Sequence, residues 1–134
     1  MAVAGLDHVN IIASNLEATV DFYGKVLGLV RDPNSVLEKM GRRGAWMQDE
    51  TGYPIMHIQG YDAALHQANQ AGDVTPTGAI DHVALQCSGF AAMLEHLAAL
   101  GIEHRVNDRQ FGSLRQIFIT DPDQVKLELN YAAD

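Results

Sequence analysis

The sequence contains a single cysteine, no long apolar run and no secretory leader pattern. Cys87 stands alone among the 134 residues, so the chain can form neither an internal disulfide nor a cysteine pair with zinc spacing. No stretch approaches the roughly 20 apolar residues of a membrane span. The first residues lack the charged and apolar regions of a signal peptide. These absences predict a cytoplasmic protein with no membrane partner.

Basic residues are also scarce. Lys and Arg total 9 against 17 Asp and Glu, which gives a formal net charge of -8 at pH 7. A chain of this charge repels phosphate backbones, so nucleic acid is excluded as a partner. The sequence also lacks a glycine-rich phosphate loop and a Gly-x-Ser-x-Gly turn. A small molecule is therefore the expected ligand.

An internal repeat is the main positive signal. The stretch Leu6-Asp7-His8-Val9 returns as Ile80-Asp81-His82-Val83, and each copy is followed by a helical pattern and a glycine. The repeat predicts one domain over residues 1–134, built from two modules at 1–60 and 79–134. Residues 61–78, which end in a cluster of glycine and proline, are expected to link them.

Hydrophobic periodicity predicts the elements of each module. In the first module we expect a strand at 6–12, a helix at 16–27 and strands at 36–40, 45–48 and 55–59. The linker has a pattern for a short helix at 63–69. In the second module we expect a strand at 80–86, a helix at 90–100 and strands at 103–106, 116–120 and 125–130.

The order of these elements predicts an α+β fold of two βαβββ modules in tandem. Helices are expected to cover one face of each sheet, and the polar faces are expected to pair into a cupped, mixed sheet. Small sheets of this kind leave strand edges exposed, so the halves must pair with each other or with a second copy. A homodimer is the expected assembly.

Four predicted strands carry a metal-capable side chain on the face away from the apolar core. These side chains are His8, His57, His82 and Glu128. Imidazole and carboxylate ligands suit iron, nickel, zinc, cobalt or manganese, and two histidines with one carboxylate form a recurrent iron(II) site. A single strand histidine is more often structural, and Glu128 can equally be an edge charge. The duplication favours ligation for His8 and His82, whereas the alternative for His57 is a hydrogen bond within the cup.

The sequence resembles the vicinal oxygen chelate superfamily. This superfamily includes glyoxalase I, methylmalonyl-CoA epimerase, fosfomycin-resistance enzymes, bleomycin-resistance proteins and type I extradiol dioxygenases. The resemblance covers nearly the whole chain, through the two histidine repeats, the stretch from Asp21 to Leu29, and the stretch from Phe118 to Asp123 that leads to Leu127-Glu128-Leu129. It implies the glyoxalase/bleomycin resistance/dioxygenase fold.

The resemblance also implies roles for the four candidate residues. It places the metal on His8, His82 and Glu128, and makes His57 either a fourth ligand or an acid/base group. Glyoxalase I usually has a carboxylate at the position of His57 and the epimerase has an amide, whereas extradiol dioxygenases keep a histidine that does not bind the metal. The dioxygenase pattern, however, prefers tyrosine where this chain has Phe118 and glycine where it has Gln124.

The resulting expectation is a metalloenzyme that chelates two adjacent oxygens of a small substrate. Iron(II) is the favoured metal, with nickel, zinc, cobalt or manganese as alternatives. Ring cleavage of the extradiol type is the first hypothesis. The alternatives are a lyase, isomerase or transferase of the glyoxalase, epimerase or fosfomycin-resistance type, and a binding protein for a small molecule that has lost turnover.

Overall fold

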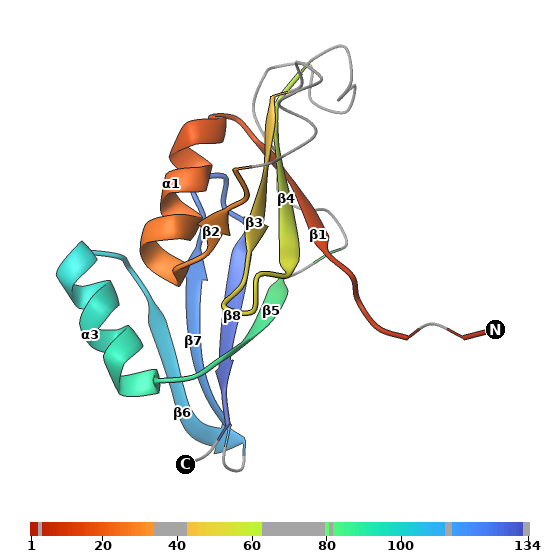
Figure 1. The fold of residues 1–134 in the computed structure, drawn as a ribbon. Coiled ribbons are helices and arrows are strands. Elements are labelled where there is room, and N and C mark those ends of the chain that lie inside the picture. The colour runs from red at the N-terminus through yellow and green to blue at the C-terminus, as the bar shows by residue number, and fades with distance from the viewer. Residues whose placement is uncertain (3, 34–42, 63–79, 81, 112–113, 133–134) are drawn as a thin grey trace. The chain divides into compact units, whose positions relative to one another are not determined.

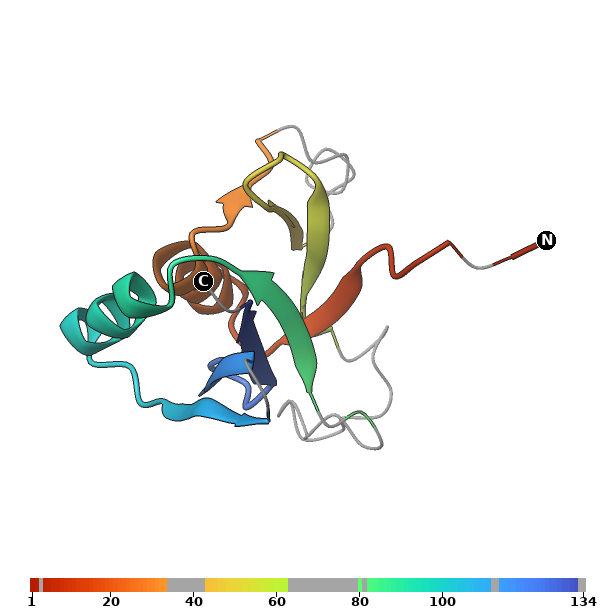
Figure 2. The same ribbon diagram turned by 90° about the horizontal axis from the view of Figure 1, so that it is seen from below.

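The computed structural model describes residues 1–2, 4–33, 43–62, 80, 82–111 and 114–132. The chain divides into two compact units, Met1–Val74 and Thr75–Asp134, each of which has its own sheet. The units are described separately below, and their ribbons are shown in Figure 1 and, from below, in Figure 2.

The first unit contains one helix and a four-stranded mixed sheet. Its elements are β1 (Val9–Ala13), α1 (Leu16–Leu27), β2 (Val30–Arg31), β3 (Gly44–Gln48) and β4 (Pro54–Gly60). The strand order is β1-β4-β3-β2, with β1 parallel to β4 and the other pairs antiparallel. Helix α1 packs on β3 and β4 (Figure 1).

Local signals fix both ends of α1. The Asn15 side chain accepts a hydrogen bond from the Ala18 backbone N–H at 3.1 Å, which caps the first turn. Gly28 ends the helix in the left-handed conformation, with φ of 71°. The buried stripe consists of Leu16, Thr19, Tyr23 and Val26, at helical spacing. The predicted bounds of this helix are confirmed.

The second unit repeats this arrangement. Its elements are β5 (Val83–Cys87), α3 (Phe90–Leu100), β6 (Arg105–Phe111), β7 (Leu114–Thr120) and β8 (Lys126–Tyr131). The strand order is β5-β8-β7-β6, again with the first pair parallel and the others antiparallel. Gly101 ends α3 with φ of 66°, as Gly28 ends α1. The tandem βαβββ prediction is therefore confirmed, whereas the pairing of the two sheets into a cup stays a prediction.

The predicted starts of the two histidine strands are wrong by three residues. The observed strands begin at Val9 and Val83, so His8 and His82 each lie one residue before their strand. Leu6 and Ile80 extend the apolar pattern, but they are 87% and 63% exposed, and no strand of the described residues pairs with them. The apolar pattern shows where a strand is possible but does not determine where it begins: β4 starts at Pro54, two residues before Met56, the partner of Val9.

Other differences concern edge strands. The two-residue strand β2 was not predicted, and β6 begins two residues later and extends further than the predicted strand at 103–106. The predicted strand at 36–40 and helix at 63–69 lie outside the described residues. Within the part of the chain that the structure describes, no helix has the length and apolar character needed to cross a membrane.

Candidate functional site

Strand register brings the polar side chains of the first unit together on one face. Asn10 on β1 and Trp46 on β3 are both paired with His57 on the central strand β4, so the three residues form a row across the sheet. Residues at matching register positions share a face, and His8 lies two residues before Asn10 on the same side. The opposite face contributes the fully buried residues Met47, Met56 and Ile58.

Trp46 contacts both imidazoles of this unit. Its indole stacks on His57 with ring centroids 4.4 Å apart and an interplanar angle of 7°. His8 meets the same indole edge-on, with centroids 4.8 Å apart and an angle of 69°. His57 is consequently only 8% exposed. The tryptophan therefore restricts the orientation of both rings.

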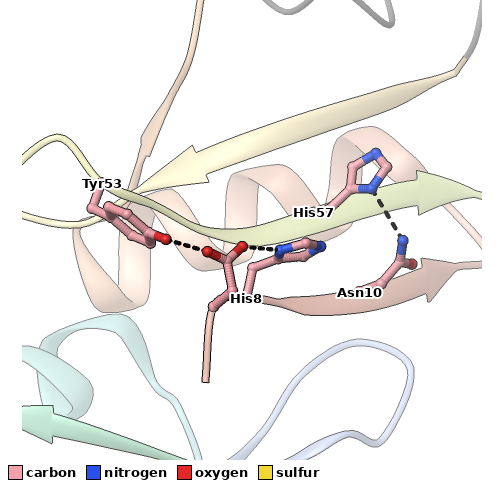
Figure 3. A network of polar contacts seen from close by, with 5 residues as sticks. His8, Asn10, Tyr53 and His57 are labelled. Carbon is pink, nitrogen blue, oxygen red and sulfur yellow. Dashed lines mark hydrogen bonds and ion pairs between the residues drawn. The ribbon is translucent and has the colours of Figure 1, made fainter. Parts of the chain in front are cut away.

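The hydrogen bonds of His57 determine which nitrogen carries its proton. The Asn10 amide faces the ring with Nδ2 and donates to His57 Nδ1 at 3.0 Å, as Figure 3 shows. Because Nδ1 accepts, the proton of the neutral ring is on Nε2. Among the described residues this buried Nε2 has no hydrogen-bond partner. Burial lowers the pKa of His57 and the charge of His8 lowers it further, so the ring is neutral at pH 7.

His8 is held by an acidic neighbour. Its Nδ1 lies 2.6 Å from a carboxylate oxygen of Asp7, and the other Asp7 oxygen accepts a hydrogen bond from the Tyr53 hydroxyl. The hydrogen bonds from His8 and Tyr53 lower the pKa of Asp7, so this carboxylate is ionised at neutral pH. The Nε2 atom is the ring nitrogen of His8 that remains for another ligand.

The second unit places an imidazole beside a carboxylate. Glu128 on β8 pairs with Ala84 on β5, two residues after His82, and His82 Nε2 lies 3.1 Å from Glu128 Oε2. Two ligands of one metal with bonds of about 2.0 to 2.2 Å lie roughly 3.0 to 3.5 Å apart. The spacing of this pair thus suits shared metal ligation as well as an ion pair.

A buried amide network orients Glu128. Gln116 donates from Nε2 to Glu128 Oε1 at 2.7 Å and to Asn130 Oδ1 at 3.0 Å, and its own Oε1 accepts from Asn107 Nδ2 at 2.8 Å. Gln116 occupies one carboxylate oxygen and leaves the other, Oε2, turned to His82. On the same face Phe118 pairs with Glu128. The Arg105 guanidinium lies over the Phe118 ring, with its Cζ 4.2 Å from the ring centroid.

The four predicted site residues thus form two pairs, one in each unit. His57 pairs with Asn10 and Glu128 pairs with Ala84, which are equivalent positions when His8 is aligned with His82. Neither unit alone brings three His, Cys, Asp or Glu side chains of its described residues into a metal-binding group. The assembly of both pairs around one ion stays a prediction.

The donor chemistry of these pairs fits a divalent cation. His8 has Nε2 left over by its contact with Asp7, and His82 and Glu128 present adjacent nitrogen and oxygen atoms. Such imidazole and carboxylate donors suit iron(II), nickel, zinc, cobalt or manganese. His57 fits less well as a ligand, because its Nδ1 accepts from Asn10 and its Nε2 bears the proton.

Sequence reasoning missed the residues that support these four. The contacts of Trp46, Tyr53 and Gln116 depend on which strands are neighbours and in which register, whereas Asp7 is next to His8 in the sequence. Two of the supporting residues had a usable signal: the two-residue period of a strand places Asn10 on the face of His8, and the pair Asp7-His8 returns as Asp81-His82.

Comparison with known proteins gives consistent matches along the chain. The sequence model of the Glyoxalase/Bleomycin resistance protein/Dioxygenase superfamily matches residues 5–129. Among curated sequences, Glyoxylase I 4 of Arabidopsis thaliana is 24% identical over 135 residues, which cover 95% of this chain and 70% of the plant protein.

Solved structures show the same fold. A glyoxalase family protein from Bacillus anthracis has a TM-score of 0.74 at 21% identity, with 98% of each chain covered. The fosfomycin resistance protein FosX from Listeria monocytogenes has a TM-score of 0.70 at 20% identity, with 98% of this chain and 94% of that chain covered.

Proposed function

Because the chain belongs to the glyoxalase/bleomycin resistance protein/dioxygenase superfamily, whose members commonly use a divalent metal, we propose that it is a metal-dependent enzyme acting on a small oxygen-rich substrate. His8, His82 and Glu128 are the proposed ligands, and His57 is the proposed acid/base group. A bound divalent cation supplies Lewis acidity to two adjacent substrate oxygens.

One observation carries this proposal. Each unit has a histidine directly before its first strand and a second metal-capable group at the equivalent position of the neighbouring parallel strand. Ligands contributed by duplicated modules would recur in this way, so the recurrence supports ligation by His8 and His82. The 3.1 Å approach of His82 Nε2 to Glu128 Oε2 supports the same assignment.

His57 has the properties of a proton donor and acceptor. Its lowered pKa keeps the ring neutral at pH 7, and its Nε2–H has no protein partner among the described residues. Asn10 holds the ring by Nδ1, so Nε2 is the atom that can give a proton to a substrate oxygen and take it back. Trp46 stacks on the ring and fixes its plane.

A non-oxidative reaction is the first candidate, as in the glyoxalase and fosfomycin-resistance branches. The named relatives Glyoxylase I 4 and FosX favour it. Substrates with two adjacent oxygens, such as vicinal dicarbonyl compounds with a thiol, or fosfomycin with a thiol or water, are the compounds to test.

Ring cleavage of the extradiol type is the second candidate. The set of two histidines and one glutamate, with a further histidine that keeps its proton on Nε2, favours it and favours iron(II) as the metal. Phe118 stands where that branch prefers tyrosine. Oxygen uptake with catechols by the iron(II)-loaded protein would support this reaction over the first.

A His57→Gln variant tests the role given to His57. We expect turnover of the active substrate to fall by about 10²- to 10⁴-fold, the usual value of general acid/base catalysis, while metal affinity is retained. Parallel loss of metal affinity and turnover would instead make His57 a fourth ligand. Turnover equal to the wild type would exclude both roles.

A binding protein without turnover is the remaining alternative. It would bind its ligand equally well in the metal-free protein and in a His8→Ala variant. Substrate binding that needs both the metal and His8 would exclude it.

A cytoplasmic location stays a prediction from the lone cysteine.

A further inference from the structure

A chain of hydrogen bonds links the β3–β4 turn to His8. The Tyr53 hydroxyl donates to one oxygen of Asp7, and the second oxygen of that carboxylate lies 2.6 Å from His8 Nδ1. Figure 3 shows Tyr53 and His8 at the two ends of this chain. Strands β1 and β4 are parallel neighbours, so residues just before each of them lie at the same end of the sheet.

The contact with Asp7 determines the tautomer of His8. An ionised carboxylate is only an acceptor, so the His8 nitrogen facing it must be the donor and carry the proton. The lone pair of the neutral ring is then on Nε2. Metal-binding histidines commonly donate their second N–H to a carboxylate, which fixes the ring and raises its basicity.

The other end of the chain is anchored in a rigid turn. Asp49 Oδ1 accepts hydrogen bonds from the Thr51 N–H at 2.9 Å and from the Tyr53 N–H at 3.1 Å. The Asp49 N–H donates to the Tyr53 carbonyl at 2.9 Å, and Gly52 supplies the left-handed conformation with φ of 83°. The backbone of Tyr53 is therefore held in place directly before β4.

A contribution to the stability of the fold does not explain these hydrogen bonds between Tyr53, Asp7 and His8. The side chain of Asp7 is 72% exposed and Tyr53 is 46% exposed, and polar contacts at such exposure contribute little to stability. What the chain controls is the orientation of His8, whose ring is also held edge-on by Trp46.

We infer that Asp7 and Tyr53 are positioning residues for His8, which hold its Nε2 ready for the metal. The inference rests on the proposed metal site. The sequence pair Asp7-His8 returns as Asp81-His82, although Asp81 lies outside the described residues.

Trp46 provides the signal for the test. It is the only tryptophan of the chain and its ring centroid lies 4.8 Å from that of His8, so cobalt(II) bound at His8 should quench its fluorescence. Cobalt(II) titration of the full-length wild type, Asp7→Ala, Asp7→Asn and Tyr53→Phe then gives four affinities. Glu50→Ala removes an exposed carboxylate from the same turn and serves as the matched control.

We expect Asp7→Ala to weaken cobalt(II) binding by about 10- to 100-fold, the usual effect of losing such a partner. Asp7→Asn keeps an acceptor for His8 and should recover part of the affinity. Tyr53→Phe loses one hydrogen bond and should weaken binding by about 2- to 10-fold. Glu50→Ala should bind as the wild type does. Affinities of Asp7→Ala and Glu50→Ala that agree within error would overturn the inference.

A second readout needs no metal. Nitrogen-15 NMR of the metal-free protein near pH 8 reports whether the proton of neutral His8 is on Nδ1 or Nε2. We expect Nδ1–H in the wild type and a shift towards Nε2–H in Asp7→Ala. If the wild type binds no cobalt(II) but this shift is seen, the proposed metal function fails and the positioning role stands. If the tautomer does not change, the positioning role fails, whatever the metal result.

Discussion

At the scale of single residues, the amide of Gln116 joins three polar side chains of the second unit, one of them the predicted site residue Glu128. It donates to Glu128 and Asn130 and accepts from Asn107, and it is 8% exposed. Removing it leaves buried polar groups without partners, which costs more than the bonds themselves are worth. The carboxylate of Glu128 therefore depends on a residue that no motif marks.

We expect Gln116→Ala to lower the free energy of unfolding by about 1 to 3 kcal/mol in urea denaturation. The control is Gln86→Ala, which removes the same side chain from an exposed position of β5 and should change stability by less than about 0.5 kcal/mol. Equal effects of the two substitutions would contradict the role of the buried network.

The lowered pKa of His57 predicts how the stability of the metal-free protein depends on pH. The unfolded chain takes up the proton near pH 6.5, whereas the folded chain takes it up only at lower pH. Between these values the unfolded state binds more protons, so stability is fully present above about pH 6.5 and falls as the pH decreases. Urea unfolding between pH 8 and pH 5 should show a smaller loss for His57→Gln than for the wild type. Parallel curves would show that His57 is not buried in its neutral form.

At the scale of elements, the helices were predictable and the strand ends were not. Helix α1 is determined by residues within its own sequence, with Asn15 before it and Gly28 after it. The apolar pattern does not give the start of a strand: β1 begins at Val9 although the pattern starts at Leu6. The two-residue strand β2 is too short to produce any pattern.

The cap of α1 gives an element-scale prediction. Asn15→Ala removes the acceptor for the Ala18 N–H and should lower the free energy of unfolding by about 1 kcal/mol, whereas Asn15→Asp keeps the acceptor and most of the stability. Thermal and urea unfolding of both variants measure this difference. Identical stabilities of the two variants would show that the cap contributes nothing.

The same contrast holds for the candidate site. The repeat and the two-residue period of strands were enough to select His8, His57, His82 and Glu128 as candidates on the faces of the two sheets away from the apolar core. The resemblance implied that His57 and Glu128 hold equivalent positions, and the register of β4 and β8 agrees with it. Trp46 reaches His57 across the β3–β4 pair, and Tyr53 reaches Asp7 from the turn between these strands.

At the scale of the whole molecule, the duplicated modules leave open edges. Within the described residues, β1 and β2 form the edges of one sheet, and β5 and β6 form the edges of the other. Unpaired edges favour pairing with another strand, so we predict a homodimer. Sedimentation velocity at micromolar concentration should give the mass of two chains, and a single species of 14.6 kDa would contradict the prediction.

The central claim is that one metal ion takes ligands from both modules. Its most direct test is the stoichiometry and affinity of cobalt(II) binding to the wild type, His8→Ala and His82→Ala, with His96→Ala on the exposed face of α3 as the control. The account predicts one ion per chain for the wild type and His96→Ala, and loss of that ion in both of the other variants. Binding of wild-type stoichiometry and affinity by either His8→Ala or His82→Ala would contradict it, because the ion would then not depend on both modules.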